Sequence, residues 1–190
     1  LFAFTFLNAQ SENTKDIETL FERPSKIRGY IGPITKLTTL DGETAYMSGV
    51  HAAGIFNDHF VLGFYNMDIE NNVWSNKDNY IGSTIDFEHK GLWLGYIFMP
   101  KSLIHFNTNV QLGKGNLEIY DNIMDQWILD DMVFVVTPSI EAELNITRFL
   151  RIGIGANYQF TMDVDKFANY SDDDFSNFGG FVTFKFGWFK

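Results

Sequence analysis

The chain has 190 residues, enough for one domain, and it contains no cysteine, which excludes a disulfide framework and a thiolate metal site. Aromatic residues make up 17% of it, and so many large rings need a dry environment. The net charge of −10 opposes contact with nucleic acid, so no nucleic-acid partner is expected. Because no run of 18 apolar residues occurs, the chain could cross a membrane only with strands.

The first residues predict an exported protein. Residues 1–9 are apolar and end in a small residue, Ala9, as at the end of a signal peptide. A short buried strand is the alternative interpretation. We expect a signal-peptide remnant at 1–9, a polar periplasmic arm at 10–27 and a β-barrel at 28–190.

From Arg28 onward, apolar and polar residues alternate with the period of two that is typical of strands. The clearest example is the segment 103–113. One face carries Ile104, Phe106, Thr108, Val110 and Leu112, and the other carries His105, Asn107, Asn109, Gln111 and Gly113.

Eight such segments predict an all-β fold, an eight-stranded antiparallel up-and-down transmembrane β-barrel. Short links, such as Asn57–Asp58, alternate with longer ones; only the first hairpin, at Asp41–Gly42, breaks this rule. The expected strands are 28–40, 43–56, 59–70, 79–98 with a break near 88–91, 102–114, 131–145, 149–162 and 177–189.

The long connections are expected to be extracellular loops, and they are acidic. The segments 66–79, 114–131 and 162–176 together carry as much net negative charge as the whole chain. The remainder is balanced, so the acidic character belongs to one end of the predicted barrel.

The alternation alone does not decide whether the apolar face meets lipid or the interior. Two features favour lipid: charges of both signs fall on the polar faces, and aromatic residues near the strand ends could form interfacial girdles. These aromatic residues are Tyr96, Phe98, Tyr158, Phe160, Phe184 and Trp188. The alternative is a soluble periplasmic barrel that binds a small apolar ligand.

Four segments resemble a family of small outer-membrane β-barrel proteins of unassigned function from Gram-negative bacteria. The segments are Arg28–Pro33, Pro100–Phe106, Glu143–Phe149 and Phe184–Phe189, and the likeness spans 28–190. It implies an outer-membrane location and insertion by the outer-membrane assembly machinery, which reads an aromatic-ended last strand. Here Lys190 follows that aromatic residue, and this departs from the family pattern. The family carries no known catalytic residues.

The polar faces predict a barrel-interior charge network. Its proposed members are Lys36, Glu141, Glu143, Arg151 and Lys185. An eight-stranded barrel is narrow and filled with side chains, so paired charges that plug the lumen are favoured over a gated pore.

Other candidate chemistry is weak. Asp172, Asp173 and Asp174 form an acidic loop cluster that could bind a cation, but they lack the spacing of a calcium loop, so a solvated loop is preferred. The four histidines show no zinc spacing. His105 and Ser102 are three residues apart and fall on opposite strand faces, which disfavours a lipid-modifying active site.

We therefore predict a non-enzymatic, monomeric outer-membrane barrel that contacts outer-membrane lipids, with a structural or surface-interaction role through its acidic loops. A lipid-modifying outer-membrane enzyme is the alternative. No cofactor and no metal site are expected.

Overall fold

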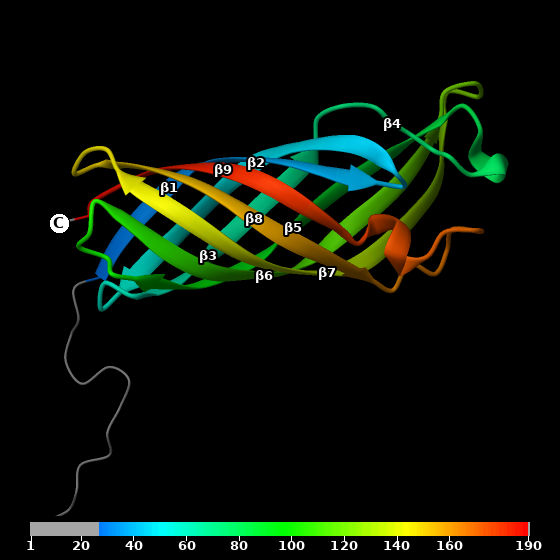
Figure 1. Ribbon diagram of the computed structural model, residues 1–190. Coiled ribbons are helices and arrows are strands. Elements are labelled where there is room, and N and C mark those ends of the chain that lie inside the picture. The colour runs from blue at the N-terminus through cyan, green and yellow to red at the C-terminus, as the bar shows by residue number, and fades with distance from the viewer. Residues whose placement is uncertain (1–26, 190) are drawn as a thin grey trace, which may run out of the picture.

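The computed structural model describes residues 27–189, which form one closed antiparallel β-barrel (Figure 1). Eight long strands build the wall, and a two-residue strand, β4, extends it beyond the end of β3. Two short 3-10 helices, η1 (Asp78–Tyr80) and η2 (Asp172–Phe175), lie in connections. The strands are β1 (Ile27–Leu40), β2 (Glu43–Phe56), β3 (Phe60–Ile69), β4 (Val73–Trp74), β5 (Ser83–Phe98), β6 (Ile104–Asp121), β7 (Gln126–Asn145), β8 (Leu150–Met162) and β9 (Asn177–Gly187).

Closure gives every long strand two neighbours. Long strands that follow one another along the chain pair with each other, β3 with β5 included, and β9 pairs with β1. A closed wall leaves no free strand along the barrel, which a lipid environment requires because backbone groups find no water there. The predicted eight-stranded up-and-down barrel is confirmed. None of the helices in residues 27–189 has the length and apolarity needed to cross a bilayer.

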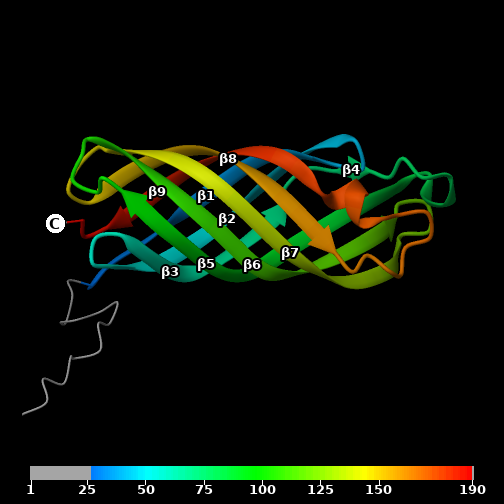
Figure 2. The same ribbon diagram turned by 60° about the horizontal axis from the view of Figure 1, so that its bottom comes forward.

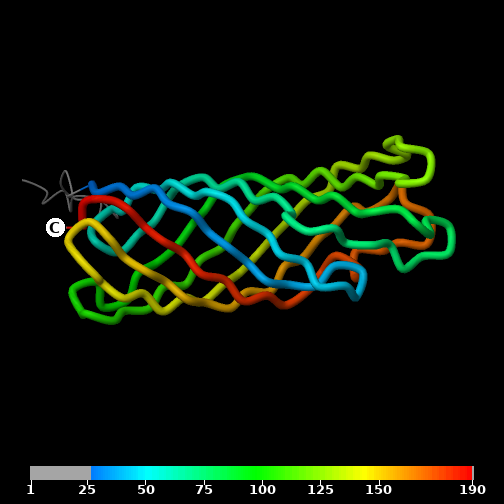
Figure 3. Tube along the Cα trace, turned by 90° about the horizontal axis from the view of Figure 1, so that it is seen from above, coloured from blue at the N-terminus to red at the C-terminus, as the bar shows by residue number. Residues whose placement is uncertain are grey.

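The two ends of the barrel differ (Figures 1 and 2). One end, the turn end, carries the tight connections 57–59, 99–103 and 146–149 and the end of β9. The other end, the loop end, carries the connections 70–82 and 163–176 and the tip of the β6–β7 hairpin (Figure 3).

The N-terminal predictions fall largely outside the described part. Residues 1–9, expected as a signal-peptide remnant, lie outside it, as do residues 10–26 of the expected periplasmic arm. Ile27, which we assigned to that arm, already begins β1.

The segment 115–130 was predicted as a long loop, and this is wrong. β6 continues to Asp121 and β7 begins at Gln126, so a four-residue turn joins two long strands. Their pairing extends to Asp121 and Gln126, with one register shift beside Ile119. β5 is also continuous where a break was expected, and it begins at Ser83 rather than near 79.

The apolar face of the barrel wall points outward. Phe64 and Ile154 are each more than half exposed although they lie well inside β3 and β8. The alternate positions point inward and are polar, such as Asn107 and Gln159. A soluble barrel would have the opposite arrangement, so the alternative with an apolar ligand cavity is wrong.

The interior itself has two zones. Toward the turn end, β6 to β9 carry buried charged and amide side chains, whereas β2, β3 and β5 carry buried apolar ones such as Ile55, Val61 and Ile97. Toward the loop end the interior is an apolar core, in which Phe87 of β5 is the strand partner of Leu117 of β6 and lies near Phe175 of η2. These three side chains are at most 1% exposed, as are Val133 and Val135 of β7.

Candidate functional site

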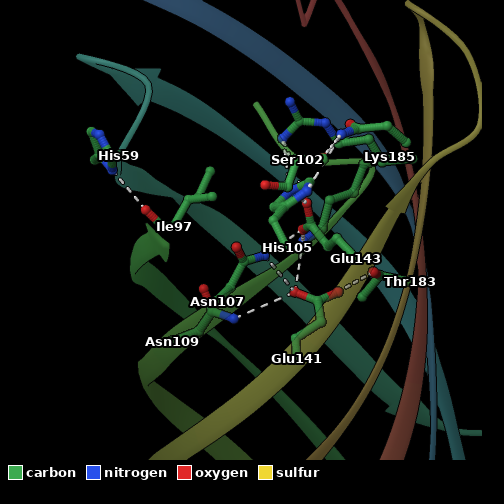
Figure 4. A network of polar contacts seen from close by, with 12 residues as sticks. His59, Ile97, Ser102, His105, Asn107, Asn109, Glu141, Glu143, Thr183 and Lys185 are labelled. Carbon is green, nitrogen blue, oxygen red and sulfur yellow. Dashed lines mark hydrogen bonds and ion pairs between the residues drawn. The ribbon is translucent and has the colours of Figure 1, made fainter. Parts of the chain in front are cut away.

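The turn-end interior holds a compact charge network (Figure 4). Glu141 and Glu143 are two residues apart on β7, so both point into the barrel. Lys185 of β9 donates to both: its Nζ lies 2.7 Å from Glu141 Oε2 and also contacts Glu143 Oε1. From β6, His105 Nε2 lies 2.8 Å from Glu143 Oε2. All four side chains are at most 2% exposed.

Arg151 of β8 completes this network from the turn-end side. Its Nη1 lies 3.5 Å from Glu143 Oε2, and its guanidinium carbon lies 4.0 Å from the centre of the Phe189 ring. Two carboxylates therefore face one ammonium and one guanidinium, and this balance is what makes burial of all four charges tolerable.

Neutral side chains satisfy the remaining carboxylate lone pairs. Asn107 Nδ2 donates to Glu143 Oε1 at 2.5 Å and to Glu141 Oε2 at 3.2 Å, and the Thr183 hydroxyl donates to Glu141 Oε1. Gly153 of β8 lies beside Glu141, and a Cβ atom at that position would collide with the carboxylate. Glycine at position 153 therefore leaves the space on the β8 side that the Glu141 carboxylate occupies.

Lys36 was expected to continue this ring, but the structure places it elsewhere. It is buried in the interior on β1, and its Nζ donates to Gln159 Oε1 at 2.6 Å. Its strand position lies farther toward the loop end than Lys185, because the β1–β9 register pairs Lys36 with Phe181. Four of the five proposed residues therefore form one network, and Lys36 stands apart from it.

A second polar cluster joins the connections at the loop end. Lys77 Nζ lies 2.8 Å from Asp174 Oδ1 and 3.6 Å from Asp41 Oδ1. The Tyr170 hydroxyl bonds Asp41 Oδ2 at 3.2 Å and Ser75 Oγ at 2.5 Å. We call Asp41, Ser75, Lys77, Tyr170 and Asp174 the loop lock, because it ties the β1–β2 turn to both long connections.

Electrostatics within the loop lock favour its charged form. Partial burial alone would raise the pKa of Asp174, but the bonds from Lys77 and Ser171 outweigh it and hold that pKa below its usual range. The bond to Asp174, together with the nearby Asp41 charge, raises the pKa of Lys77 against a smaller opposing effect of burial. Sequence reasoning missed this lock, since its members lie in three separate segments.

Two carboxylates of the acidic triplet already have hydrogen-bond partners within the fold. Asp172 Oδ1 accepts the Val164 amide at 3.0 Å, and Asp174 is committed to Lys77 and Ser171. Across residues 27–189, no three His, Cys, Asp or Glu side chains are grouped so that they could hold a metal ion. Asp172, Asp173 and Asp174 instead form helix η2, whose Ser171 and Asp174 make a capping box.

The His105–Ser102 pair weighed for lipid chemistry is not assembled, and neither is a second serine–histidine pair with the same spacing, His51 and Ser48. His105 is fully buried in the charge network, whereas Ser102 is exposed in a turn. His51 is buried and stacks on Trp93, whereas Ser48 points outward and donates to Glu70.

The geometry defines the class of protein: a closed eight-stranded barrel with an apolar outer wall and a polar, filled lumen is a small transmembrane β-barrel. No protein-family model matches the chain, and no curated protein matches it in sequence. Solved structures match its fold. The N-terminal β-barrel domain of Pseudomonas aeruginosa OprF aligns with a TM-score of 0.58 and 9% identity, covering 84% of this chain and 97% of that one.

Two further structures match similarly. Neisserial surface protein A aligns with a TM-score of 0.56 and 11% identity, covering 86% of this chain and 97% of the other. The outer membrane protein OprG from Pseudomonas aeruginosa aligns with a TM-score of 0.51 and 10% identity, covering 86% and 94%. The chain thus has the fold of small outer-membrane β-barrels, and this fold agrees with the predicted outer-membrane location.

Proposed function

We propose that the chain is a non-enzymatic, monomeric outer-membrane barrel whose loop end faces the cell exterior and contacts a partner surface. The observation that carries this proposal is the tip of the β6–β7 hairpin. Ile123, Met124 and Trp127 are each more than half exposed there. Apolar side chains that are exposed in water mark interaction sites more often than chance.

The height of the tip supports its contact with water rather than lipid. The outward face of β6 is apolar up to Leu112 and polar from Lys114. From Leu112 to Tyr120 the strand rises roughly 26 Å at about 3.3 Å per residue, or about 20 Å along the axis of a tilted barrel. This height above the apolar band of β6 supports contact of Trp127 with water rather than lipid.

The rigidity of the loop end also supports a contact role. The connection 163–176 is an ordered part of the fold, because Val164, Phe167 and Tyr170 are each at most 8% exposed. A pre-ordered surface loses little conformational entropy on binding. The carboxylates around the hairpin give this surface a negative potential, which would favour a basic partner.

A labelling experiment in intact cells tests the orientation. Since the chain has no cysteine, Met124→Cys and Ser102→Cys each introduce a single thiol, one at the loop end and one at the turn end. A membrane-impermeant maleimide should label Met124→Cys in whole cells and Ser102→Cys only after the outer membrane is permeabilised. The reverse pattern would overturn the proposal.

An adhesion assay then tests the contact itself. Cells displaying the wild-type chain should be retained on amine-coated beads more strongly than cells displaying a Trp127→Ser, Asp125→Asn double variant. Lys114→Gln, an exposed charge change below the tip, is the control. Equal retention of all three would show that the hairpin does not mediate the contact.

Release of fatty acid from phospholipid by the purified chain would instead support the enzyme alternative.

A further inference from the structure

The turn end carries a cationic pocket that the proposed surface role does not use. It has a volume of about 460 Å³, in the range of small-ligand sites, and it opens at the mouth of the barrel. Four basic side chains and one carboxylate line it: Arg28, Lys101, Arg148, Arg151 and Asp58. In a chain with a net charge of −10, this concentration of positive charge is unusual.

The positive charge in this pocket is only partly neutralised. Arg28 Nη1 pairs with Asp58 Oδ1 at 2.8 Å. Arg151 lies 3.5 Å from Glu143, a carboxylate that Lys185 already contacts. Within residues 27–189, neither Lys101 nor Arg148 belongs to any ion pair.

Two donors at the pocket also lack partners. Arg151 is 3% exposed, and its Nε–H has no hydrogen-bond acceptor within the described residues. The Nε–H of Arg28 is buried and unpartnered in the same way. A buried donor without an acceptor is costly, so an acceptor supplied by a ligand would relieve that cost.

We propose that this pocket binds a phosphate group, from a soluble phosphate ester or a phospholipid head group. Guanidinium groups present paired N–H donors that match the oxygen atoms of phosphate, and three of the four cations are arginines. The same pocket is lined by Pro100, Ile146 and Phe189. These apolar side chains suit an ester with a carbon chain beside its phosphate.

The pocket also lies at the edge of the apolar wall, which places it near lipid head groups. Trp188 and Phe149, close to it in sequence and packed edge to face at 5.5 Å, are both more than half exposed. Exposed tryptophan and phenylalanine at a barrel rim are typical of the interface between hydrocarbon and water.

Calorimetry on the full chain in a zwitterionic detergent tests the proposal. Inorganic phosphate is titrated at constant ionic strength, with chloride as the competing anion. One phosphate should bind per chain, and Arg148→Gln should weaken binding at least tenfold. Lys114→Gln, an exposed cation on the outside of β6, should leave it unchanged. A heat-dependent shift of the unboiled band in SDS confirms that each variant is folded.

A second titration separates the two sources of phosphate. Short-chain phosphatidylglycerol, kept below its micelle concentration, should compete with phosphate if the head group of a lipid is the natural ligand. If phosphate binds and the lipid does not compete, the ligand is a soluble ester. Absence of binding by both probes, or equal weakening by Arg148→Gln and Lys114→Gln, overturns the site. Neither result bears on the labelling of the loop end, so the two proposals fail separately.

Discussion

The two halves of the barrel share the same strands but differ in which face of the wall is apolar. In the half toward the turn end, the outward positions of β6 are apolar, such as Phe106 and Leu112, and its inward positions are polar, such as His105 and Asn107. In the half toward the loop end, the outward positions of β6 are Lys114 and Glu118, and the inward position Leu117 belongs to an apolar core. The pleat continues without interruption, but its polarity inverts.

This inversion indicates where the surroundings of the wall change from lipid to water. A strand that is apolar outside lies in lipid, and a strand that is apolar inside lies in water. The change occurs between Leu92 and Lys90 on β5 and between Leu112 and Lys114 on β6. These residues are neighbours in the sheet, because Leu92 pairs with Leu112 and Lys90 with Lys114. On these two strands the boundary therefore falls at the same register.

The largest expected effect comes from breaking the charge network in the lipid-embedded half. Lys185→Met leaves Glu141 and Glu143 buried with too little positive charge, and loss of one partner of a buried ion pair costs about 3–5 kcal/mol. The free energy of unfolding in detergent, measured with urea, should fall by about that amount.

The double variant Lys185→Met, Glu141→Gln is the control for the Lys185 prediction. It restores the charge balance and should recover part of the loss. No recovery would mean that packing, rather than charge, holds this half together.

The next effect concerns the apolar half. Phe175→Ala empties part of the loop-end core, and a buried phenylalanine contributes about 3 kcal/mol or more. Because Phe175 lies in η2, the damage should be local. Limited proteolysis should cut the connection 163–176 faster, while the SDS-resistant barrel band persists. Simultaneous loss of that band would contradict the division into two halves.

A smaller effect separates buried from exposed cations. Arg151→Ala should lower stability by about 2 kcal/mol, because Glu143 keeps Lys185 and His105 as partners. Lys166→Ala should cost less than about 1 kcal/mol, since the Lys166 side chain is more than half exposed. The measurement is the midpoint of thermal unfolding of each variant. Equal midpoints would argue against an interior position for Arg151.

The smallest effect is the pH dependence of the loop lock. Asp174 has a lowered pKa in the folded state, so its contribution is complete above the ordinary Asp value of about 3.9 and disappears as the pH falls below that value. Lys77 has a raised pKa, so its contribution is complete below about 10.4 and disappears as the pH rises above that value.

Hydrogen exchange measures this dependence at the Asp41 amide, which donates to the Asp174 carbonyl. Its protection factor should be highest between these two pH values. Lys77→Met should remove most of the dependence, and a variant that keeps the full pH dependence would show that other groups control the loop end.

Much of the barrel follows from the sequence because lipid-facing strands alternate strongly. The segment 103–113 shows this pattern clearly, and β6 contains all of it except Leu103. The same reasoning failed at 115–130 because the polarity inverts there. Once charged residues such as Glu118 fall on the outward face, the segment no longer matches a lipid-facing strand, although Leu117 and Ile119 keep the period of two.

The interior charges were predictable only in part. The alternation predicted inward-pointing side chains for Glu141, Glu143 and Arg151, because each lies on the polar side of a strong pattern. Lys36 shares that side too, but its height along the axis depends on the β1–β9 register, which no local pattern specifies. The loop lock and the cationic pocket join segments distant in sequence, so only the folded chain brings their residues together.

The most direct test of the polarity inversion is a scan of solvent contact along β6. Single cysteines at Phe106, Val110, Leu112, Lys114, Asn116 and Glu118 carry a nitroxide label in lipid bilayers, and collision with oxygen or with a water-soluble nickel complex is measured. We predict contact with oxygen through Leu112 and contact with nickel from Lys114 onward. Lipid contact that continued to Glu118, or water contact already at Phe106, would contradict the account.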